Sequence, residues 1–140
     1  FTEFKKKFKN KYVNIYVQKK LFKSQNKDYV KKFIEIEKKQ KSNIIELHNR
    51  PIYLKYLVNE LKDKNYILYF HNDPLSMSGS KTINERIFLL NNCYRIVFNS
   101  NWSKKRFLQK MKSEAINSEK LLVINQSATK NKINFNKKKR

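Results

Sequence analysis

The chain of 140 residues contains two histidines, and both stand in nearly the same tetrapeptide. One tetrapeptide is His48–Pro51, with the sequence His-Asn-Arg-Pro, and the other is His71–Pro74, with the sequence His-Asn-Asp-Pro. Imidazole and amide groups donate hydrogen bonds to negative charge that develops in a reaction, and imidazole also exchanges protons near neutral pH. Both tetrapeptides are therefore candidate parts of a binding or catalytic site.

Each tetrapeptide directly follows a largely apolar run. The runs are Ile44–Leu47 and Tyr66–Phe70, and turn-forming residues bound both of them. Runs of this kind predict strands that are buried on both faces of a sheet. Open parallel α/β sheets bind their ligands at the carboxyl ends of the strands, where both tetrapeptides would lie. The alternative is that each tetrapeptide is a structural turn whose histidine bonds a backbone carbonyl.

Strand and helix patterns alternate along the rest of the chain. Further strands are predicted at residues 12–17, 94–98 and 121–124, and helices at residues 28–41, 51–61, 82–90 and 102–112. Strands that alternate with helices of this length are joined by right-handed crossovers. The order predicts an α/β fold, specifically a Rossmann-like three-layer α/β/α domain whose mainly parallel sheet is covered on both faces.

Several other side chains have simple structural roles in this scheme. Thr82–Glu85 is a capping-box sequence at the start of a helix. A stripe at helical spacing follows it, formed by Ile83, Ile87 and Leu90. The Ser100–Asn101 pair can cap the next helix, and Trp102 is interpreted as core. Arg86 is interpreted as solvated or ion-paired, and Cys93 as an inert buried thiol.

Composition restricts the chemistry further. A hydrophobic content of 39% over 140 residues is typical of one globular domain with a core of its own. The single cysteine, Cys93, excludes a disulfide framework and a cysteine-rich metal site. Gly79 is the only glycine, so the sequence has neither a P-loop nor a G-x-G-x-x-G fingerprint. We therefore expect no metal and no cofactor.

The formal net charge of +22 is distributed unevenly along the chain. Residues 1–41 carry +10, residues 42–129 carry +6 and residues 130–140 carry +6. Such charge favours an anionic membrane surface, a nucleic acid or another polyanion as partner. However, 28 of the 33 basic residues are lysines, whereas bidentate recognition of bases and phosphates favours arginine. Lysine also has AT-rich codons, so the excess can reflect genome composition alone.

Three segments carry a resemblance to a known family. They read E-L-H-N-R-P, then F-H-N-D-P-L-S-M-S-G-S-K-T-x-x-E-R, then I-V-F-N-S-x-W-S-K-K-R-F. In this order they resemble the amino-terminal domain of retaining glycosyltransferases of the family-four type. The resemblance runs from Asn43 to about Phe107, and the combined spacing is more specific than any single segment. Those enzymes have two Rossmann-like domains that face each other across a cleft.

The resemblance implies roles for the polar residues at the strand ends. His71 matches a histidine that contacts the donor sugar or its phosphate near the reaction centre, so it is the catalytic candidate. His48, Asn49 and Arg50 match a loop on the acceptor side. The remaining substrate-binding candidates are Asn72, Asp73, Ser76, Ser78, Gly79 and Ser100. The small, polar stretch 74–81 is the expected functional loop.

The resemblance also implies a domain organisation. Residues 1–125 would form the amino-terminal domain, truncated at its start because the family's glycine-rich loop is missing. Residues 126–140 would be a basic interdomain linker, in which Gln126 and Ala128 depart from the family's usual glycine and acidic residue. The second domain, which would bind most of the nucleotide-sugar, would be absent.

The expected function is transfer of a sugar from a nucleotide-sugar to a glycan or lipid-linked acceptor, with retention of configuration. The expected pathway is assembly of a cell-envelope polysaccharide or lipopolysaccharide. The expected location is the cytoplasm, in peripheral contact with the anionic inner face of the cytoplasmic membrane. The isolated chain would be inactive. Two alternatives remain open, a basic nucleic-acid-binding α/β module and a truncated gene product that folds but has no activity.

Overall fold

The computed structural model describes residues 25–111 and 118–125 of the chain. The predicted strand at residues 12–17 and the predicted linker at residues 126–140 lie outside the described residues. The helices are α2 (Gln25–Gln40), α3 (Leu54–Glu60), α4 (Ile83–Asn92) and α5 (Asn101–Leu108). The strands are β1 (Ile44–His48), β2 (Asn65–Phe70), β3 (Arg95–Phe98) and β4 (Leu121–Val123). Two 3-10 turns, η1 (Pro51–Tyr53) and η2 (Pro74–Ser76), follow β1 and β2.

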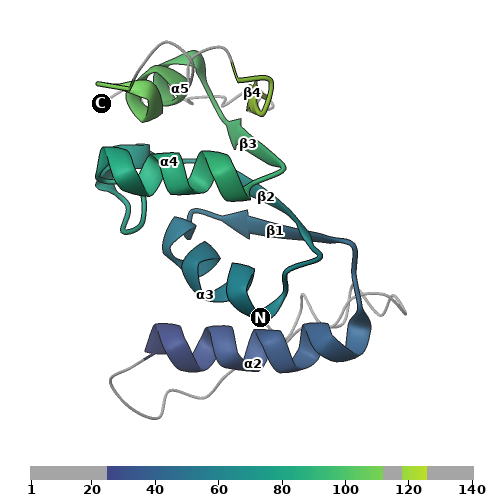
Figure 1. Cartoon of the computed structure of the whole chain (residues 1–140). Coiled ribbons are helices and arrows are strands. Elements are labelled where there is room, and N and C mark those ends of the chain that lie inside the picture. The colour runs from purple at the N-terminus through teal and green to yellow at the C-terminus, as the bar shows by residue number, and fades with distance from the viewer. Residues whose placement is uncertain (1–24, 112–117, 126–140) are drawn as a thin grey trace, which may run out of the picture.

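The four strands form one parallel sheet in the order β1-β2-β3-β4 (Figure 1). The predicted α/β class with a parallel, Rossmann-like sheet is therefore confirmed. Each crossover moves one strand along the sheet in the same direction. Because such crossovers are right-handed, α3, α4 and α5 all lie on the same face.

A single hydrophobic core fills the space between the sheet and these helices. The strands contribute every second residue to it, namely Ile45, Leu47, Tyr66, Leu68, Phe70, Ile96, Phe98 and Leu121. The helical contributions come from Val30, Leu54, Leu57, Leu61, Leu89 and Phe107. The rings of Phe70, Phe98 and Phe107 pack with their centroids 5.4 to 5.7 Å apart and are buried almost completely. The core therefore joins the carboxyl ends of β2 and β3 to α5.

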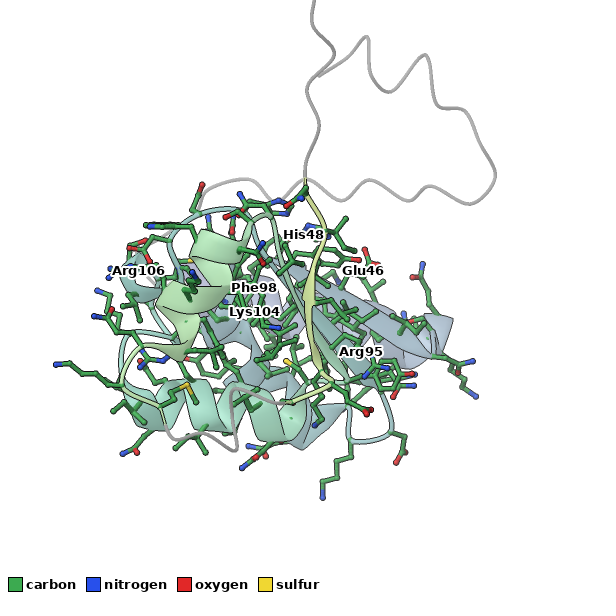
Figure 2. The ribbon with its side chains drawn as sticks, turned by 90° about the horizontal axis from the view of Figure 1, so that it is seen from above. Glu46, His48, Arg95, Phe98, Lys104 and Arg106 are labelled. Atoms are coloured by element: carbon green, nitrogen blue, oxygen red, sulfur yellow. The ribbon has the colours of Figure 1, made fainter. Side chains whose placement is uncertain are left out.

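The opposite face of the sheet, here called the second face, is not covered by any described helix. Figure 2 shows Glu46, His48 and Arg95 on this side, away from α4 and α5. Its side chains are those of Ile44, Glu46, His48, Ile67, Tyr69, Arg95, Val97 and Leu122, of which only Val97 is buried.

The prediction that β1 is buried on both faces is wrong. Its residues alternate strictly between exposed and buried, and Ile44 is 52% exposed. Strand β1 is the edge strand of the described sheet, and its polar members Glu46 and His48 fall on the second face together with Ile44. The sequence Ile44–Leu47 looks continuously apolar at its start because Ile44 is an apolar residue on the exposed face, although the strand alternates between exposed and buried residues.

Two helices are oriented differently from the sequence interpretation. In α4 the buried residues are Arg86 and Leu89, whereas Ile83 and Ile87 are about two-fifths exposed. Arg86 is buried because its guanidinium donates to the carbonyl oxygens of Ser80, Lys81 and Gln109, so its interpretation as a solvated or ion-paired side chain is wrong. Burial lowers the pKa of Arg86, and the charge of the Glu85 carboxylate opposes this shift in part.

Helix α5 begins with the predicted cap, but its aromatic residue points outward. Ser100 accepts a hydrogen bond from Ser103 N, and Asn101 is already helical. Trp102 is 58% exposed and lies 5.8 Å from the Arg106 guanidinium, so its assignment to the core is wrong. The capping box at the start of α4 is confirmed, because Thr82 and Glu85 exchange hydrogen bonds. Cys93 is buried as predicted, and burial raises the pKa of its thiol to about 12.

The only glycine of the chain joins the two loops that follow β1 and β2. Gly79 has a φ of +93°, a region that residues with a Cβ rarely adopt. A Cβ at this position would lie 2.5 Å from Ile52 N and 2.9 Å from the carbonyl carbon of Pro51. Gly79 therefore allows the backbones of the two loops to touch.

Replacing Gly79 with alanine should destabilise the protein by roughly 3 kcal/mol, because the methyl group meets backbone atoms and the φ is unfavourable. Urea denaturation followed by circular dichroism would measure the loss. Ser78→Ala is the matched control, because Ser78 is an exposed neighbour on the same loop, and it should change stability by less than about 0.5 kcal/mol. Equal stabilities of the two variants would contradict this account of Gly79.

Candidate functional site

The two histidines meet at the carboxyl edge of the sheet, on its second face. His48 Nδ1 lies 2.9 Å from His71 Nε2, and His48 Nε2 lies 3.4 Å from Glu46 Oε2. The His48 ring also stacks on the ring of Tyr69, its register partner on β2, with centroids 4.6 Å apart and planes within 1°. Glu46, His48, Tyr69 and His71 therefore form one contiguous cluster, here called the imidazole cluster.

Hydrogen-bond chemistry limits which ring nitrogens of the two histidines in this cluster carry a proton. A neutral histidine has one N–H donor and one acceptor nitrogen. If His48 donates its Nε2–H to the Glu46 carboxylate, its Nδ1 must accept, and His71 must then donate its Nε2–H. If His48 instead carries its proton on Nδ1, it donates to His71 Nε2, and the N–H of His71 is then on Nδ1. Partial burial and the Glu46 carboxylate raise the pKa of Tyr69, which keeps its phenol protonated.

Two asparagines hold the backbone of His71 from opposite sides. Asn49 Oδ1 accepts a hydrogen bond from His71 N at 2.8 Å, and Asn99 Nδ2 donates to His71 O at 2.8 Å. Asn49 has a φ of 54°, a left-handed conformation that asparagine tolerates better than most residues. The loops after β1 and β3 thus fix the position of the first residue after β2.

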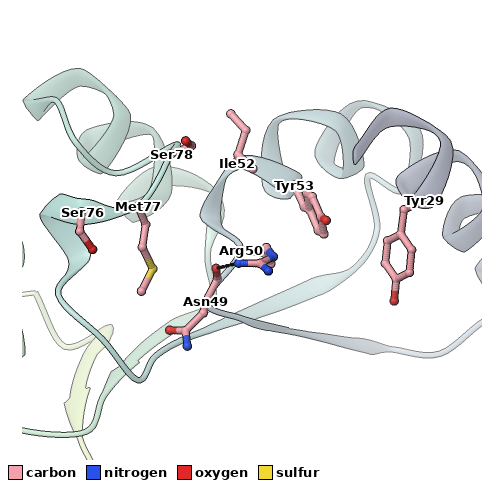
Figure 3. Close-up of a pocket in the computed structure, with 8 residues that line it drawn as sticks. All are labelled: Tyr29, Asn49, Arg50, Ile52, Tyr53, Ser76, Met77 and Ser78. Carbon is pink, nitrogen blue, oxygen red and sulfur yellow. Dashed lines mark hydrogen bonds between the residues drawn. The ribbon is translucent and has the colours of Figure 1, made fainter. Parts of the chain in front are cut away.

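A cleft of about 570 Å³ opens beside the imidazole cluster, between the loops after β1 and β2 (Figure 3). Its lining residues are Tyr29, Asn49, Arg50, Ile52, Tyr53, Ser76, Met77 and Ser78. A smaller cleft of about 170 Å³ shares Tyr29, Arg50 and Tyr53 and extends to Glu46 and His48. The larger volume lies within the range of roughly 300–1,000 Å³ that is typical of small-molecule sites.

The structure therefore brings together six of the ten predicted site residues. His48 and His71 are in the imidazole cluster, and Asn49, Arg50, Ser76 and Ser78 line the cleft. Asn72 is exposed on the loop directly after His71. The other three predicted residues, Asp73, Gly79 and Ser100, make contacts within the protein.

Asp73, on the loop after β2, is held by Arg106 of α5. Arg106 donates its Nη2–H to Asp73 Oδ2 at 3.0 Å and its Nε–H to Asp73 Oδ1 at 3.3 Å. The Arg106 guanidinium and the Leu75 N–H hold the pKa of the Asp73 carboxyl below its usual range. Gly79 packs against backbone, and Ser100 caps α5. These three residues support the site without facing the cleft.

Several residues of the site were not predicted from the sequence. Glu46 and Tyr69 complete the imidazole cluster, Asn99 holds His71, and Tyr29 and Tyr53 line the cleft. The spacing of two between Glu46 and His48 was an available signal, because such residues share one face of a strand. Tyr29 lies 19 positions before His48 on a separate helix, and no local pattern indicates that contact.

Among residues 25–111 and 118–125, no group of three or more histidine, cysteine or acidic side chains is arranged to hold a metal ion. None of the helices within these ranges combines the length and apolar character needed to cross a lipid bilayer. Comparisons of the chain with family models, curated proteins and solved structures found no match. The fold class is thus α/β with a parallel sheet, and functional inference rests on the geometry of the site.

Replacing Asn49 with glycine should speed amide hydrogen exchange at His71 by roughly fivefold, since it removes an acceptor worth about 1 kcal/mol. Glycine keeps the left-handed backbone, so the effect isolates the side-chain oxygen. Exchange measured by NMR on the backbone amide of His71 is the readout. Asn49→Asp retains the oxygen and should preserve the protection. Unchanged exchange in the glycine variant would show that the bond does not hold His71.

Asp73→Asn should lower the free energy of unfolding by about 1 kcal/mol near neutral pH, because it removes a half-buried pair with Arg106. The folded pKa of Asp73 is depressed, so its contribution is present above its unfolded pKa and disappears as the pH falls through the folded pKa. Urea titrations at about pH 7 and about pH 3 should therefore show a difference between variant and parent that shrinks in acid. Asp63→Asn, at an exposed aspartate, is the control. A difference that persists in acid would contradict the pairing.

Proposed function

We propose that this chain is the acceptor-side half of a glycosyltransferase that transfers a sugar from a nucleotide-sugar with retention of configuration. The observation that carries the proposal is the imidazole cluster at the carboxyl edge, next to a cleft of ligand size. In parallel α/β folds this edge is where substrates bind. The ordered resemblance of three segments to family-four glycosyltransferases supports the same assignment.

The proposed reaction sets two tasks at this edge. The bond between the sugar's anomeric carbon and a phosphate oxygen breaks, and a bond to the acceptor hydroxyl forms as that hydroxyl loses its proton. Negative charge develops on the departing nucleoside diphosphate, and preorganised donors stabilise it. In the tautomer in which His71 Nε2 accepts from His48 Nδ1–H, the N–H of His71 is on Nδ1, and this group is the proposed donor to the sugar or its phosphate. The His71 backbone is held by Asn49 and Asn99, so its ring is positioned before the substrate binds.

His48 has a positioning role in this proposal. It accepts or donates at 2.9 Å from His71 and is itself held between Glu46 and the Tyr69 ring. The Glu46 carboxylate orients the His48 ring, and the His48 ring in turn orients the His71 ring. The adjacent cleft, with Arg50, Ser76 and Ser78, would receive the acceptor.

The donor nucleotide would be bound mainly by a second Rossmann-like domain outside these 140 residues. The sequence contains no glycine-rich loop, so these 140 residues lack that kind of backbone site for a diphosphate. A role in cell-envelope glycan assembly, in the cytoplasm and in peripheral contact with anionic membrane, is part of the proposal. The formal charge of +22 supports the membrane contact.

The test is an NMR titration of the 140-residue chain with UDP-glucose and GDP-mannose. Weak binding should shift the imidazole resonances of His48 and His71, and His71→Ala should weaken it at least fivefold. The His71 side chain is only half-buried, outside the core, so its truncation should leave the melting temperature nearly unchanged. Asn91→Ala, at the far end of α4, is the control variant. The chain alone should show no turnover, because catalysis requires the closed cleft between two domains.

Three outcomes would contradict the proposal. The first is the absence of imidazole shifts with either nucleotide-sugar even at about 10 mM, where a weak contact between the donor and His71 would still be populated. The second is a sharp fall in melting temperature for His71→Ala with unchanged binding, which would make His71 a structural turn residue. The third is tighter binding to an RNA oligonucleotide at physiological salt than to either nucleotide-sugar, which would favour the nucleic-acid-binding alternative.

A further inference from the structure

Among the described residues that line the larger cleft, Arg50 has the one charged side chain (Figure 3). The Arg50 guanidinium donates from Nη1 to Asn49 O at 3.2 Å, and no described carboxylate lies within the 4.0 Å of an ion pair. A guanidinium has five N–H donors, so most of those on Arg50 are not used by the described residues. No acidic residue of the described ranges lines this cleft.

Arg50 differs in this respect from Arg86 and Arg106. Arg106 is paired with Asp73, and Arg86 is buried among carbonyl oxygens. Arg95 lies 4.7 Å above the ring of Tyr94, on the other side of the sheet from the core. Structural roles therefore account for Arg86 and Arg106, whereas Arg50 lines a cleft and has no ion-pair partner within the described part of the chain.

The rest of the cleft has the chemistry of a carbohydrate site. Tyr29 and Tyr53 form one wall, with ring centroids 6.0 Å apart, and supply both apolar ring surface and phenol groups. Ser76 and Ser78 contribute hydroxyls from the opposite loop, and Ile52 and Met77 add apolar surface. Hydroxyls on one side and aromatic rings on the other suit a ring-shaped ligand with polar edges and apolar faces.

We propose that this cleft binds a carbohydrate that carries an oxyanion, either a phosphate or a carboxylate. The Arg50 guanidinium pairs with the oxyanion, because its planar fork matches the geometry of these groups. Tyr29 and Tyr53 contact the sugar ring. This ligand class would be the acceptor of the proposed glycosyltransferase, and that role rests on the proposed function. The binding of an anionic carbohydrate in the cleft does not depend on it.

The test compares ligands that share a sugar ring and differ in charge. Glucose 6-phosphate, glucuronate, glucose and inorganic phosphate are titrated into the 140-residue chain at constant ionic strength, with NMR as the readout. The two charged sugars should bind at least tenfold more tightly than glucose or phosphate and should shift the amides of Arg50, Tyr53 and Ser78. Vesicles of phosphatidylcholine with and without phosphatidylinositol test whether a lipid-borne sugar phosphate binds better than a free one.

Variants separate the cleft from general charge effects. Arg50→Gln should weaken glucose 6-phosphate binding at least tenfold, and Arg50→Lys should weaken it several-fold, because lysine keeps the charge but loses the bidentate fork. Arg95→Gln removes the same charge outside the cleft and should bind like the parent. Arg50 is exposed, so its variants should keep the parent melting temperature.

The proposal would be overturned by glucose binding as tightly as its phosphate, by Arg50→Gln binding like the parent, or by inorganic phosphate competing as well as the charged sugars. These outcomes are distinguishable from failure of the transferase proposal. If charged sugars bind through Arg50 but nucleotide-sugars do not shift the histidine resonances, the anionic-sugar site is supported and the transferase proposal is contradicted. If nucleotide-sugars shift the histidine resonances but charged sugars do not bind through Arg50, only the anionic-sugar proposal is contradicted.

Discussion

Gly79 brings the loop after β2 so close to the loop after β1 that a Cβ in its place would lie 2.5 Å from Ile52 N. This contact joins the wall of the cleft that carries Ser76–Ser78 to the wall that carries Arg50 and Tyr53. The width of the cleft is therefore set by backbone packing, which varies less than side-chain packing. Ser80, fully buried beside Gly79, donates its hydroxyl to the Pro74 carbonyl and closes the loop on itself.

The asymmetry of the described sheet places the histidines where a ligand can reach them. Strands that succeed one another in one direction with right-handed crossovers put all connecting helices on one face. Residues of the opposite parity, including His48 and Tyr69, then lie on the face without those helices. His71 stands one residue beyond β2, and its hydrogen bonds to Asn49 and Asn99 set it beside His48. Reactive groups thus lie outside the core while rigid backbone positions them.

The local sequence does not determine whether an arginine side chain is buried or which partner it binds. Arg86 faces inward on α4 because carbonyl oxygens as distant in sequence as that of Gln109 accept its hydrogen bonds, and this turns Ile83 and Ile87 outward. Asp73, a predicted substrate-binding residue, accepts a hydrogen bond from Arg106, which lies 33 positions further along the chain. The apolar periodicity of α4 could not reveal this, because helical spacing is local and these acceptors belong to other elements.

The sequence by itself determined the α/β order of elements, the strand ends at which His48 and His71 stand, and the capping box at Thr82, because periodicity and capping depend on residues a few positions apart. Only the tertiary structure decided that the two imidazoles touch, that Asn49 and Asn99 hold His71, and that Tyr29 reaches the cleft. Those contacts depend on strand register and on the close approach of two loops. Both are set by the packing of distant segments rather than by any local pattern.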